Sequence, residues 1–329
     1  MSQSIPSVTA SGAIFGAALT ASGVWQPVVI DEQMHLQSLH MMKVFLTAIA
    51  TSATGVWILK RVGWVTCAPK KPSNLGWLGK YDGNIIGGLI LGIGMTLSKA
   101  CPGTVFVQVG LGVPSGLWTL AGALLGGICY VDVANSMRVN APSEDERNTK
   151  YSIPDKLNVD SDYVLLVFEV LTGAIVTLAT KLNPHRTQLL DPVIGGILVG
   201  GAQMASLLLT KTQVGVSSAF EDVGRWFWYI IRQRGTNNKP PVRSLIFAGG
   251  IVLGSWALAQ FHLGISRADN FTINPVLALV GGALLGFGSR MGGGCTSGHG
   301  ISGMSTFSVA SIISVISMFT GGLGSAVFF

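Results

Sequence analysis

The sequence predicts an all-α protein that crosses a membrane several times. Charged residues make up 11% of the 329-residue chain, against roughly a quarter in ordinary soluble domains. Hydrophobic residues make up 49%, and the mean hydropathy is +0.54. A helix of about 20 apolar residues spans a bilayer. Runs of about this length or longer contain no Asp, Glu, Lys or Arg at residues 100–131, 192–210, 244–266, 271–289 and 291–329. We therefore expect a multi-pass integral membrane protein, which we place in the plasma membrane.

The net charge of +6 does not indicate a nucleic-acid partner, because the basic residues are concentrated in two loops. The first loop runs from Lys60 to Lys80, and the second runs from Arg225 to Arg243. Since Lys and Arg in short loops mark the cytoplasmic side, we expect both loops there, at equivalent places in two halves of similar orientation. No Lys or Arg precedes Lys43, so the N-terminus lacks the basic start of a signal peptide and is expected to belong to the mature fold.

A glycine-rich frame occurs four times along the chain. It consists of Gly, three apolar or small residues, Gly, five residues, and then Ser or Gly. With the three residues that follow, its copies cover residues 12–25, 88–101, 196–209 and 282–295. Ordinary spans are expected around the copies, at residues 36–59, 114–134, 162–181, 244–264 and 304–328.

The order of the copies predicts two similar halves. Residues 1–135 form the first half, residues 136–161 a charged linker, and residues 162–329 the second half. A GxxxG core by itself mostly marks close helix packing. Ordered internal repeats, however, are typical of transporter folds, whose sites lie between the repeats and are built from broken helices. We therefore expect Gly-rich broken or half-helices that meet at a central pathway.

Two cysteines occupy the same position of the frame. Cys101 lies in the turn SKACPGT of the second copy, and Cys295 lies in GGGCTSGHGISG of the fourth. We expect Pro102 at the first position of a new helix, which would direct a helix N-terminus at whatever contacts the sulphur. Such N-termini bind anions and favour thiolate character in a nearby cysteine. The alternative is that Cys101 and Cys295 both pack as small apolar residues. For the other two cysteines, Cys67 and Cys129, packing is the interpretation that we adopt.

Polar residues beside the two cysteines are candidate substrate contacts. Thr296 and Ser297 add hydroxyl donors to the fourth copy, and Ser98 does so in the second. Charged residues within a membrane usually face a cavity or pair with another group, so Lys99 and Arg290 could attract an anion, or they could extend to the membrane surface. His299 could donate to substrate or pack against a helix cap. The cysteine spacing shows no CxxC pair, and we expect neither a metal nor a cofactor.

The motifs SKACPGT and GGGCTSGHGISG, together with the four copies of the frame, resemble the YeeE/YedE-type sulphur-transport membrane proteins. The resemblance covers nearly the whole chain. The resemblance implies an all-helical permease for thiosulfate, whose cysteines pass the anion along by hydrogen bonds. Cys101 and Cys295 are the matching cysteines. Members of the family also carry a cysteine in the first copy, where this chain has Trp25, with Ser22 nearby as a hydroxyl donor.

Two other functions compete with a thiosulfate permease. A membrane thiol enzyme would move sulphur covalently through cysteine, but it would need a resolving thiol or an acceptor that the sequence does not show. A membrane scaffold without transport would explain the GxxxG packing and leave the two cysteines without a role. For the permease we expect the bilayer, a small sulphur anion and a cytoplasmic sulphur-carrier or sulphurtransferase protein as partners.

Overall fold

The computed structural model describes residues 4–138, 150–183, 190–232, 239–261 and 273–329. These residues form helices and loops, with one isolated backbone bridge between Ser152 and Ser308. The all-α prediction is therefore confirmed. The helices, in order, are α1 (Ile5–Ala21), α2 (Pro27–Met34), α3 (His40–Arg61), α4 (Asp82–Ser98), α5 (Thr104–Gly110), α6 (Pro114–Arg138), α7 (Ile153–Leu157), α8 (Ser161–Leu182), α9 (Pro192–Thr210), α10 (Ser218–Ile231), α11 (Arg243–Phe261), α12 (Pro275–Met291), the π-helix η1 (Thr296–Gly303) and α13 (Val309–Ala326).

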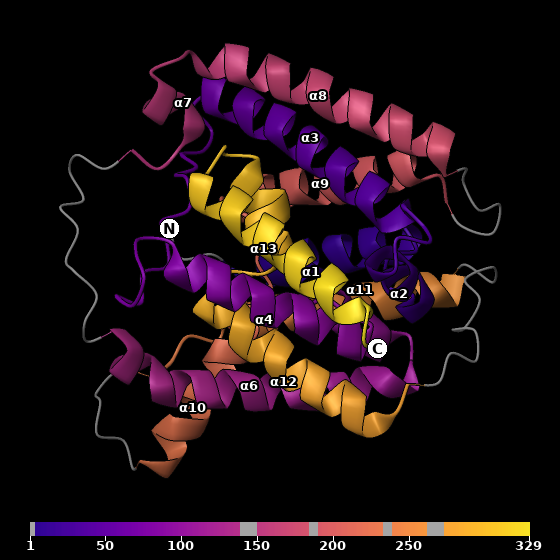
Figure 1. Ribbon diagram of the computed structural model, residues 1–329, viewed down its shortest axis with the longest axis vertical. Coiled ribbons are helices and arrows are strands. Elements are labelled where there is room, and N and C mark those ends of the chain that lie inside the picture. The colour runs from indigo at the N-terminus through magenta and orange to yellow at the C-terminus, as the bar shows by residue number, and fades with distance from the viewer. Residues whose placement is uncertain (1–3, 139–149, 184–189, 233–238, 262–272) are drawn as a thin grey trace.

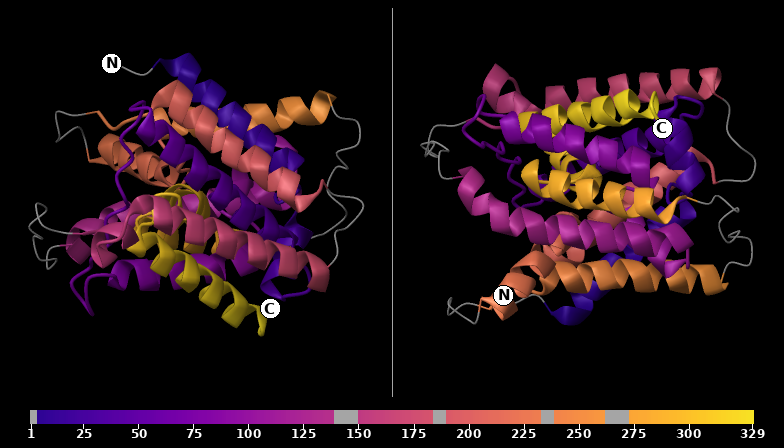
Figure 2. Two further views of the ribbon diagram at one scale, coloured as in Figure 1. Left: turned by 90° about the horizontal axis from the view of Figure 1, so that it is seen from above. Right: turned by 60° about the horizontal axis from the view of Figure 1, so that its bottom comes forward.

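Six of the described helices are long and apolar enough to cross a membrane, namely α3, α6, α8, α9, α11 and α13. A seventh crossing is made if α12 and η1 are taken together, because these two helices meet at a bend of 42°. Figure 1 shows the long helices lying side by side with their ends at two opposite faces, and the turned views of Figure 2 agree. The hydropathy predicted a multi-pass membrane protein, and the glycine-rich copies predicted a broken helix; both predictions are confirmed.

The four repeat copies form helices α1, α4, α9 and α12, and their glycines lie where these helices cross others. A Cβ atom on Gly12 of α1 would lie 2.2 Å from the carbonyl oxygen of Phe247 in α11, and one on Gly286 of α12 would lie 2.2 Å from that of Ala123 in α6. The frame glycines of α4 meet α13, and those of α9 meet α3 in the same way. Each copy thus packs on a span from the other half, so the two halves are interleaved.

Equivalent copies run in opposite directions. Gly94 of α4 packs beside Leu285 of α12, whereas Gly87, earlier in α4, packs beside Gly292, just after α12. The end of α1 likewise meets the start of α9, because Gly195 packs against Ser22. The expectation of two halves in the same orientation is therefore wrong. Helix α8, at the start of the second half, adds one crossing before the third repeat copy, so the repeat copies of the second half start from the opposite side of the membrane and are inverted.

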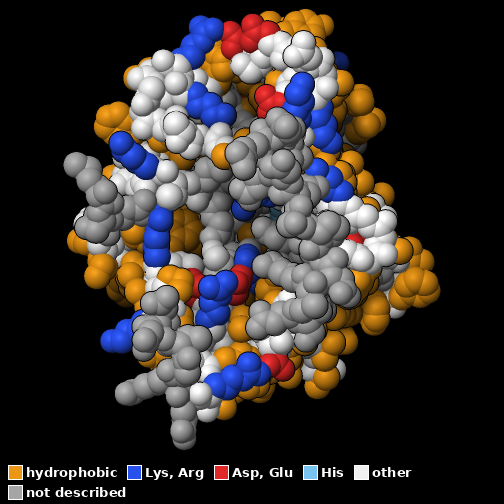
Figure 3. Space-filling view, turned by 90° about the vertical axis from the view of Figure 1, so that its left-hand side faces the viewer, with side chains coloured by type: hydrophobic (Ala, Val, Ile, Leu, Met, Phe, Trp, Pro, Cys, Tyr) orange, Lys and Arg blue, Asp and Glu red, His pale blue; other side chains and the backbone are white. Residues whose placement is uncertain are grey.

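The two basic loops nevertheless share one face, which we call the basic face. The Lys211 ammonium, after α9, lies 5.1 Å from the ring centroid of Trp64 in the first loop. Arg243, at the start of α11, donates a hydrogen bond to Thr212. Figure 3 looks onto this face and shows Lys and Arg side chains spread across it, with hydrophobic side chains at its rim. The positive-inside rule predicts that this face is cytoplasmic.

The loops do not occupy equivalent places in the repeat. Residues 62–81 connect a span, α3, to a repeat copy, α4, whereas residues 232–242 connect α10 to the span α11. Because the second half is inverted, both loops nevertheless lie on the same side of the protein. Within the predicted linker 136–161, residues 139–149 lie outside the described part of the chain, as does Arg234 of the second loop. The described remainder of the linker carries the short helix α7 beside the basic face, where the backbone N–H of Ile153 donates to the carbonyl of Phe307.

Side-specific labelling tests this arrangement. In a background with Cys67 and Cys129 replaced by alanine, Leu78→Cys and Arg232→Cys are expected to react with a membrane-impermeant maleimide only from the cytoplasmic side. Leu36→Cys, between α2 and α3 on the opposite face, is expected to react only from outside. Leu78 and Leu36 are 85% and 62% exposed, so burial does not hide either position. Labelling of Leu78→Cys and Arg232→Cys from different sides would contradict the shared face.

Candidate functional site

Cys101 lies in the break between α4 and α5. The chain leaves α4 through Lys99, which adopts a left-handed conformation with φ 49°, and Cys101 is 6% exposed. Its Sγ atom accepts hydrogen bonds from the backbone N–H of Thr104 at 3.4 Å and from the Thr104 hydroxyl at 3.3 Å. Helix α5 begins at Thr104, so Pro102 precedes the helix by two residues and does not occupy its first position. The sulphur still faces the first N–H group of the helix.

Cys295 lies in the corresponding break between α12 and η1 and is completely buried. Gly293 makes the turn possible, because its φ of +81° strains any residue that carries a Cβ. The chain then enters the π-helix η1, a form that often marks functional sites. The Cys295 Sγ atom lies 3.2 Å from the Ser297 hydroxyl. The backbone N–H of Gly298 and both the hydroxyl and the N–H of Ser217 also interact with this thiol.

The two breaks meet at one small cavity of about 40 Å³. Cys101 and Thr104 line it from the first half, and Thr296 and Ser297 line it from the second. Cys295 does not line this cavity itself, but its thiol lies 3.2 Å from the hydroxyl of Ser297, which does. The other lining residues are mostly apolar: Phe15, Leu19, Val24, Met41, Val44, Phe45, Ala48, Gly103, Val199 and Ile301. The cavity therefore combines an apolar wall with a thiol and hydroxyl groups from both repeats.

The residues just before Cys101 do not line this cavity. The Ser98 hydroxyl donates to the carbonyl of Gly94 one turn earlier, at 2.7 Å. The Lys99 ammonium pairs with the carboxylate of Asp31 in α2, with Nζ and Oδ1 2.5 Å apart. Because this pair neutralises its charge, Lys99 is placed to hold α2 against the end of α4 rather than to meet an anion in the cavity.

The first repeat copy, through Ser22 and Trp25, also contributes no free hydrogen-bond donor to the central cavity. Ser22 is buried and its hydroxyl donates to the carbonyl of Leu19. Trp25 is 1% exposed, and its indole N–H donates to the carbonyl of Thr20. The side-chain amide of Gln108 in α5 donates to the Trp25 carbonyl. Trp25 thus fills the position of the missing cysteine with a packed side chain, and Ser22 is not directed to the cavity.

His299 is buried at 1% exposure and both of its ring nitrogens have partners. Nδ1 lies 3.0 Å from the Ser311 hydroxyl, and Nε2 lies 2.9 Å from the carbonyl oxygen of Gly292. Gly292 is the residue that caps α12. The contacts of His299 therefore tie the end of α12 to α13 and support the break, without a nitrogen left for substrate.

A cluster of charged side chains lies next to Cys295, on the side of the basic face. It includes residues that the sequence analysis did not single out. Arg290 forms an ion pair with Glu221 of α10 and donates to the Ser217 hydroxyl, which also contacts Cys295. Lys70, from the first basic loop, interacts electrostatically with Cys295 and Arg290. Burial lowers the pKa of Lys70, an effect that Cys295 opposes and Arg290 strengthens. No spacing in the sequence links these residues, because they come from three distant segments.

Comparisons with known proteins identify the family to which this chain belongs. A family model described as "Sulphur transport" matches residues 21–324. The thiosulfate transporter TsuA of Spirochaeta thermophila is 24% identical over 330 residues, covering 94% of each chain. TsuA of Escherichia coli is 24% identical over 298 residues, covering 79% of this chain and 76% of that protein. A probable transporter of Xylella fastidiosa is 34% identical over 139 residues, covering 42% of this chain and 92% of that protein. The family match covers both cysteine breaks and all of the six spanning helices except the last two residues of α13, and the chain therefore belongs to the sulphur transport family of membrane proteins.

Proposed function

We propose that this protein is a permease of the plasma membrane that takes up thiosulfate through the cavity between its two cysteine breaks. The observation that carries the proposal is the convergence of Cys101, Thr104, Thr296 and Ser297 on one cavity. These residues come from the second and fourth repeat copies, which run in opposite directions and meet there. A substrate site between inverted repeats and at broken helices is the arrangement found in many transporters.

The chemistry of the cavity suits a divalent anion with a terminal sulphur atom. A charged group loses its hydration in an apolar environment, and this loss must be compensated by hydrogen bonds or opposite charge. Backbone N–H groups at Thr104 and Gly298 and hydroxyl groups at Thr104 and Ser297 interact with the thiol groups of Cys101 and Cys295. A thiol is itself a weak donor, and weak binding at successive sites lets an ion leave as well as enter.

This proposal uses two thiols rather than three. Ser22 and Trp25 occupy the corresponding part of the first copy, and the side chains of both are engaged in hydrogen bonds within the protein. The anion would therefore pass from Cys101 to Cys295 without a third cysteine. A cytoplasmic sulphur-carrier or sulphurtransferase protein remains a proposed partner. The support for it is that the pathway would open on the basic face, where such a protein could collect the imported anion.

Growth and flux measurements test the proposal. A strain without its own sulphur-uptake systems is expected to grow on thiosulfate as sole sulphur source when it carries this chain, and not with an empty vector. The purified protein in liposomes is expected to admit radiolabelled thiosulfate without any added thiol acceptor, because transport changes no bond. Protein-dependent release of sulphite inside liposomes, with uptake only when an acceptor thiol is present, would instead indicate a sulphur-transferring enzyme.

A further inference from the structure

A second and larger cavity opens below Cys295 toward the basic face. Its volume is about 460 Å³, and its wall includes Arg225, Arg243, Arg290, Glu221 and Asp222. Hydroxyl, amide and backbone groups complete the wall at Ser206, Thr210, Thr212, Gln213, Gly215, Ser218 and Ser244, with apolar contacts from Val8, Pro241 and Phe247. The cavity holds far more space than the central one and is polar over much of its wall.

The guanidinium groups of this cavity are incompletely neutralised. Glu221 is shared by Arg225 and Arg290, so one carboxylate serves two cations. Arg243 donates to the hydroxyl of Thr212, which carries no charge. The Nε–H group of Arg290 is buried and has no hydrogen-bond partner among the described residues. The cavity therefore offers an anion positive charge and, at Arg290, an N–H group without a partner among the described residues.

The two carboxylates do not cancel this charge. Burial raises the pKa of Glu221, but the ion pairs with Arg290 and Arg225 outweigh that effect and leave the pKa below its ordinary value. Burial likewise raises the pKa of Asp222, and there the hydrogen bond from Ser244 does not restore the ordinary value. Three arginines therefore face only two carboxylates, and burial raises the pKa of one of these, Asp222.

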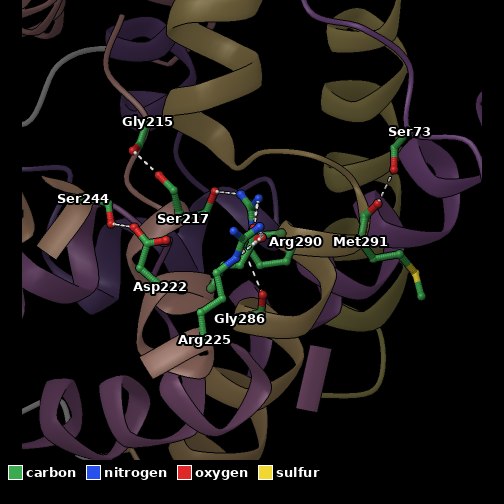
Figure 4. Close-up of polar contacts among 12 residues, drawn as sticks. Ser73, Gly215, Ser217, Asp222, Arg225, Ser244, Gly286, Arg290 and Met291 are labelled. Carbon is green, nitrogen blue, oxygen red and sulfur yellow. Dashed lines mark hydrogen bonds and ion pairs between the residues drawn. The ribbon is translucent and has the colours of Figure 1, made fainter. Parts of the chain in front are cut away.

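Arg290 connects this cavity to the thiol of Cys295. Figure 4 shows its side chain between Ser217 and Arg225, with Asp222 and Ser244 alongside. An Arg290 N–H group donates to the Ser217 hydroxyl at 3.4 Å, and Ser217 in turn contacts Cys295. On the other side, the Ser73 hydroxyl donates to the carbonyl of Met291, which holds the first basic loop against the end of α12. An anion that leaves Cys295 toward the basic face would next meet Arg290.

We propose that the cavity lined by Arg225, Arg243 and Arg290 is a second anion-binding site, which receives the doubly charged sulphur oxyanion after it leaves Cys295. This proposal rests on the thiosulfate permease proposed above. The site recognises charge and oxygen atoms, since guanidinium groups bind oxyanions through paired N–H donors, and it has no thiol in its wall to select a terminal sulphur. It should therefore take sulfate as well as thiosulfate, and selectivity for sulphur would be exercised earlier, at the cysteines.

Protection of an introduced cysteine locates the site. The full-length protein with Cys67→Ala, Cys129→Ala and Ser218→Cys is purified into phosphatidylcholine nanodiscs. The rate of its labelling by a maleimide is then measured in sulfate and in chloride solutions of equal ionic strength. Sulfate is expected to slow the labelling of Ser218→Cys at least about fivefold. The same protein carrying Leu78→Cys instead, on the basic face outside the cavity, should label at one rate in both salts.

Arginine variants identify the groups that bind. Arg243→Gln, and the double variant Arg290→Gln/Glu221→Gln that removes both partners of an ion pair, should each abolish the protection at position 218. Lys60→Gln, an exposed change on the same face, should keep it. The proposal is overturned if sulfate does not slow labelling, if both arginine variants keep the protection, or if phosphatidylglycerol nanodiscs slow labelling without sulfate, which would assign the cavity to lipid phosphate. Absence of thiosulfate uptake with intact sulfate protection would refute only the proposed function.

Discussion

Replacing Cys295 with alanine is expected to reduce thiosulfate uptake at least about tenfold while the protein remains folded. A hydrogen bond to a charged group contributes about 1.5–3 kcal/mol, and about 1.4 kcal/mol corresponds to a factor of ten. Cys295 is completely buried at the break through which the anion would pass, so no water replaces the lost thiol. Uptake of radiolabelled thiosulfate by cells, normalised to the amount of protein in the membrane, measures the effect.

The serine variant separates two roles of this thiol. Cys295→Ser keeps a hydrogen-bond donor and should retain part of the uptake, whereas a covalent persulfide mechanism would leave none. Cys129→Ala is the matched control, because Cys129 is an exposed free cysteine on a spanning helix and its loss should leave the rate unchanged. If Cys295→Ala and Cys101→Ala both transport at the parental rate with equal protein levels, the cysteines are packing residues and the proposed pathway is wrong.

Adding a single methyl group at Gly250 is expected to destabilise the whole fold. A Cβ atom there would lie 2.5 Å from the carbonyl oxygen of Thr9 and 3.1 Å from the Cα atom of Gly12. These are backbone atoms of α1, so α1 and α11 would have to move apart at the crossing where the first repeat copy packs. Overpacking of this kind typically costs about 1–3 kcal/mol. Thermal unfolding of the purified Gly250→Ala protein, followed by size-exclusion chromatography, should show an earlier loss of monodisperse protein.

The neighbouring glycine provides the control. Gly249 belongs to the same helix, and a Cβ atom on it would meet nothing within 4 Å. Gly249→Ala adds the same methyl group to the same helix, yet it should leave the unfolding temperature unchanged. Equal unfolding temperatures for Gly249→Ala and Gly250→Ala would show that the crossing of α1 and α11 is not closely packed, contrary to the structure.

Part of the site could be predicted from the sequence because it depends on local pattern. The glycine-rich frame predicted where helices break, and Cys101 and Cys295 do lie at breaks after α4 and α12. The same pattern could not show which polar neighbours face the pathway. Thr296 and Ser297 line the central cavity. Ser98 and Ser22 instead donate to carbonyl groups one turn earlier in their own segments, and Lys99 and His299 bond to groups on other helices. For Lys99 and His299, the direction of the side chain depends on neighbours in other elements, which the local pattern does not contain.

By itself, the sequence determined that this protein is helical, lies in a membrane and carries four related glycine-rich elements. These properties follow from hydropathy and from short-range spacing, because lipid forces every backbone polar group to be satisfied within a helix unless protein encloses it. Only the tertiary structure decided that the halves are inverted and interleaved, since that outcome depends on the extra crossing of α8. The same holds for the cluster below Cys295. Lys70, Ser217, Glu221 and Arg290 come together only because long-range packing joins the first basic loop, α10 and the end of α12.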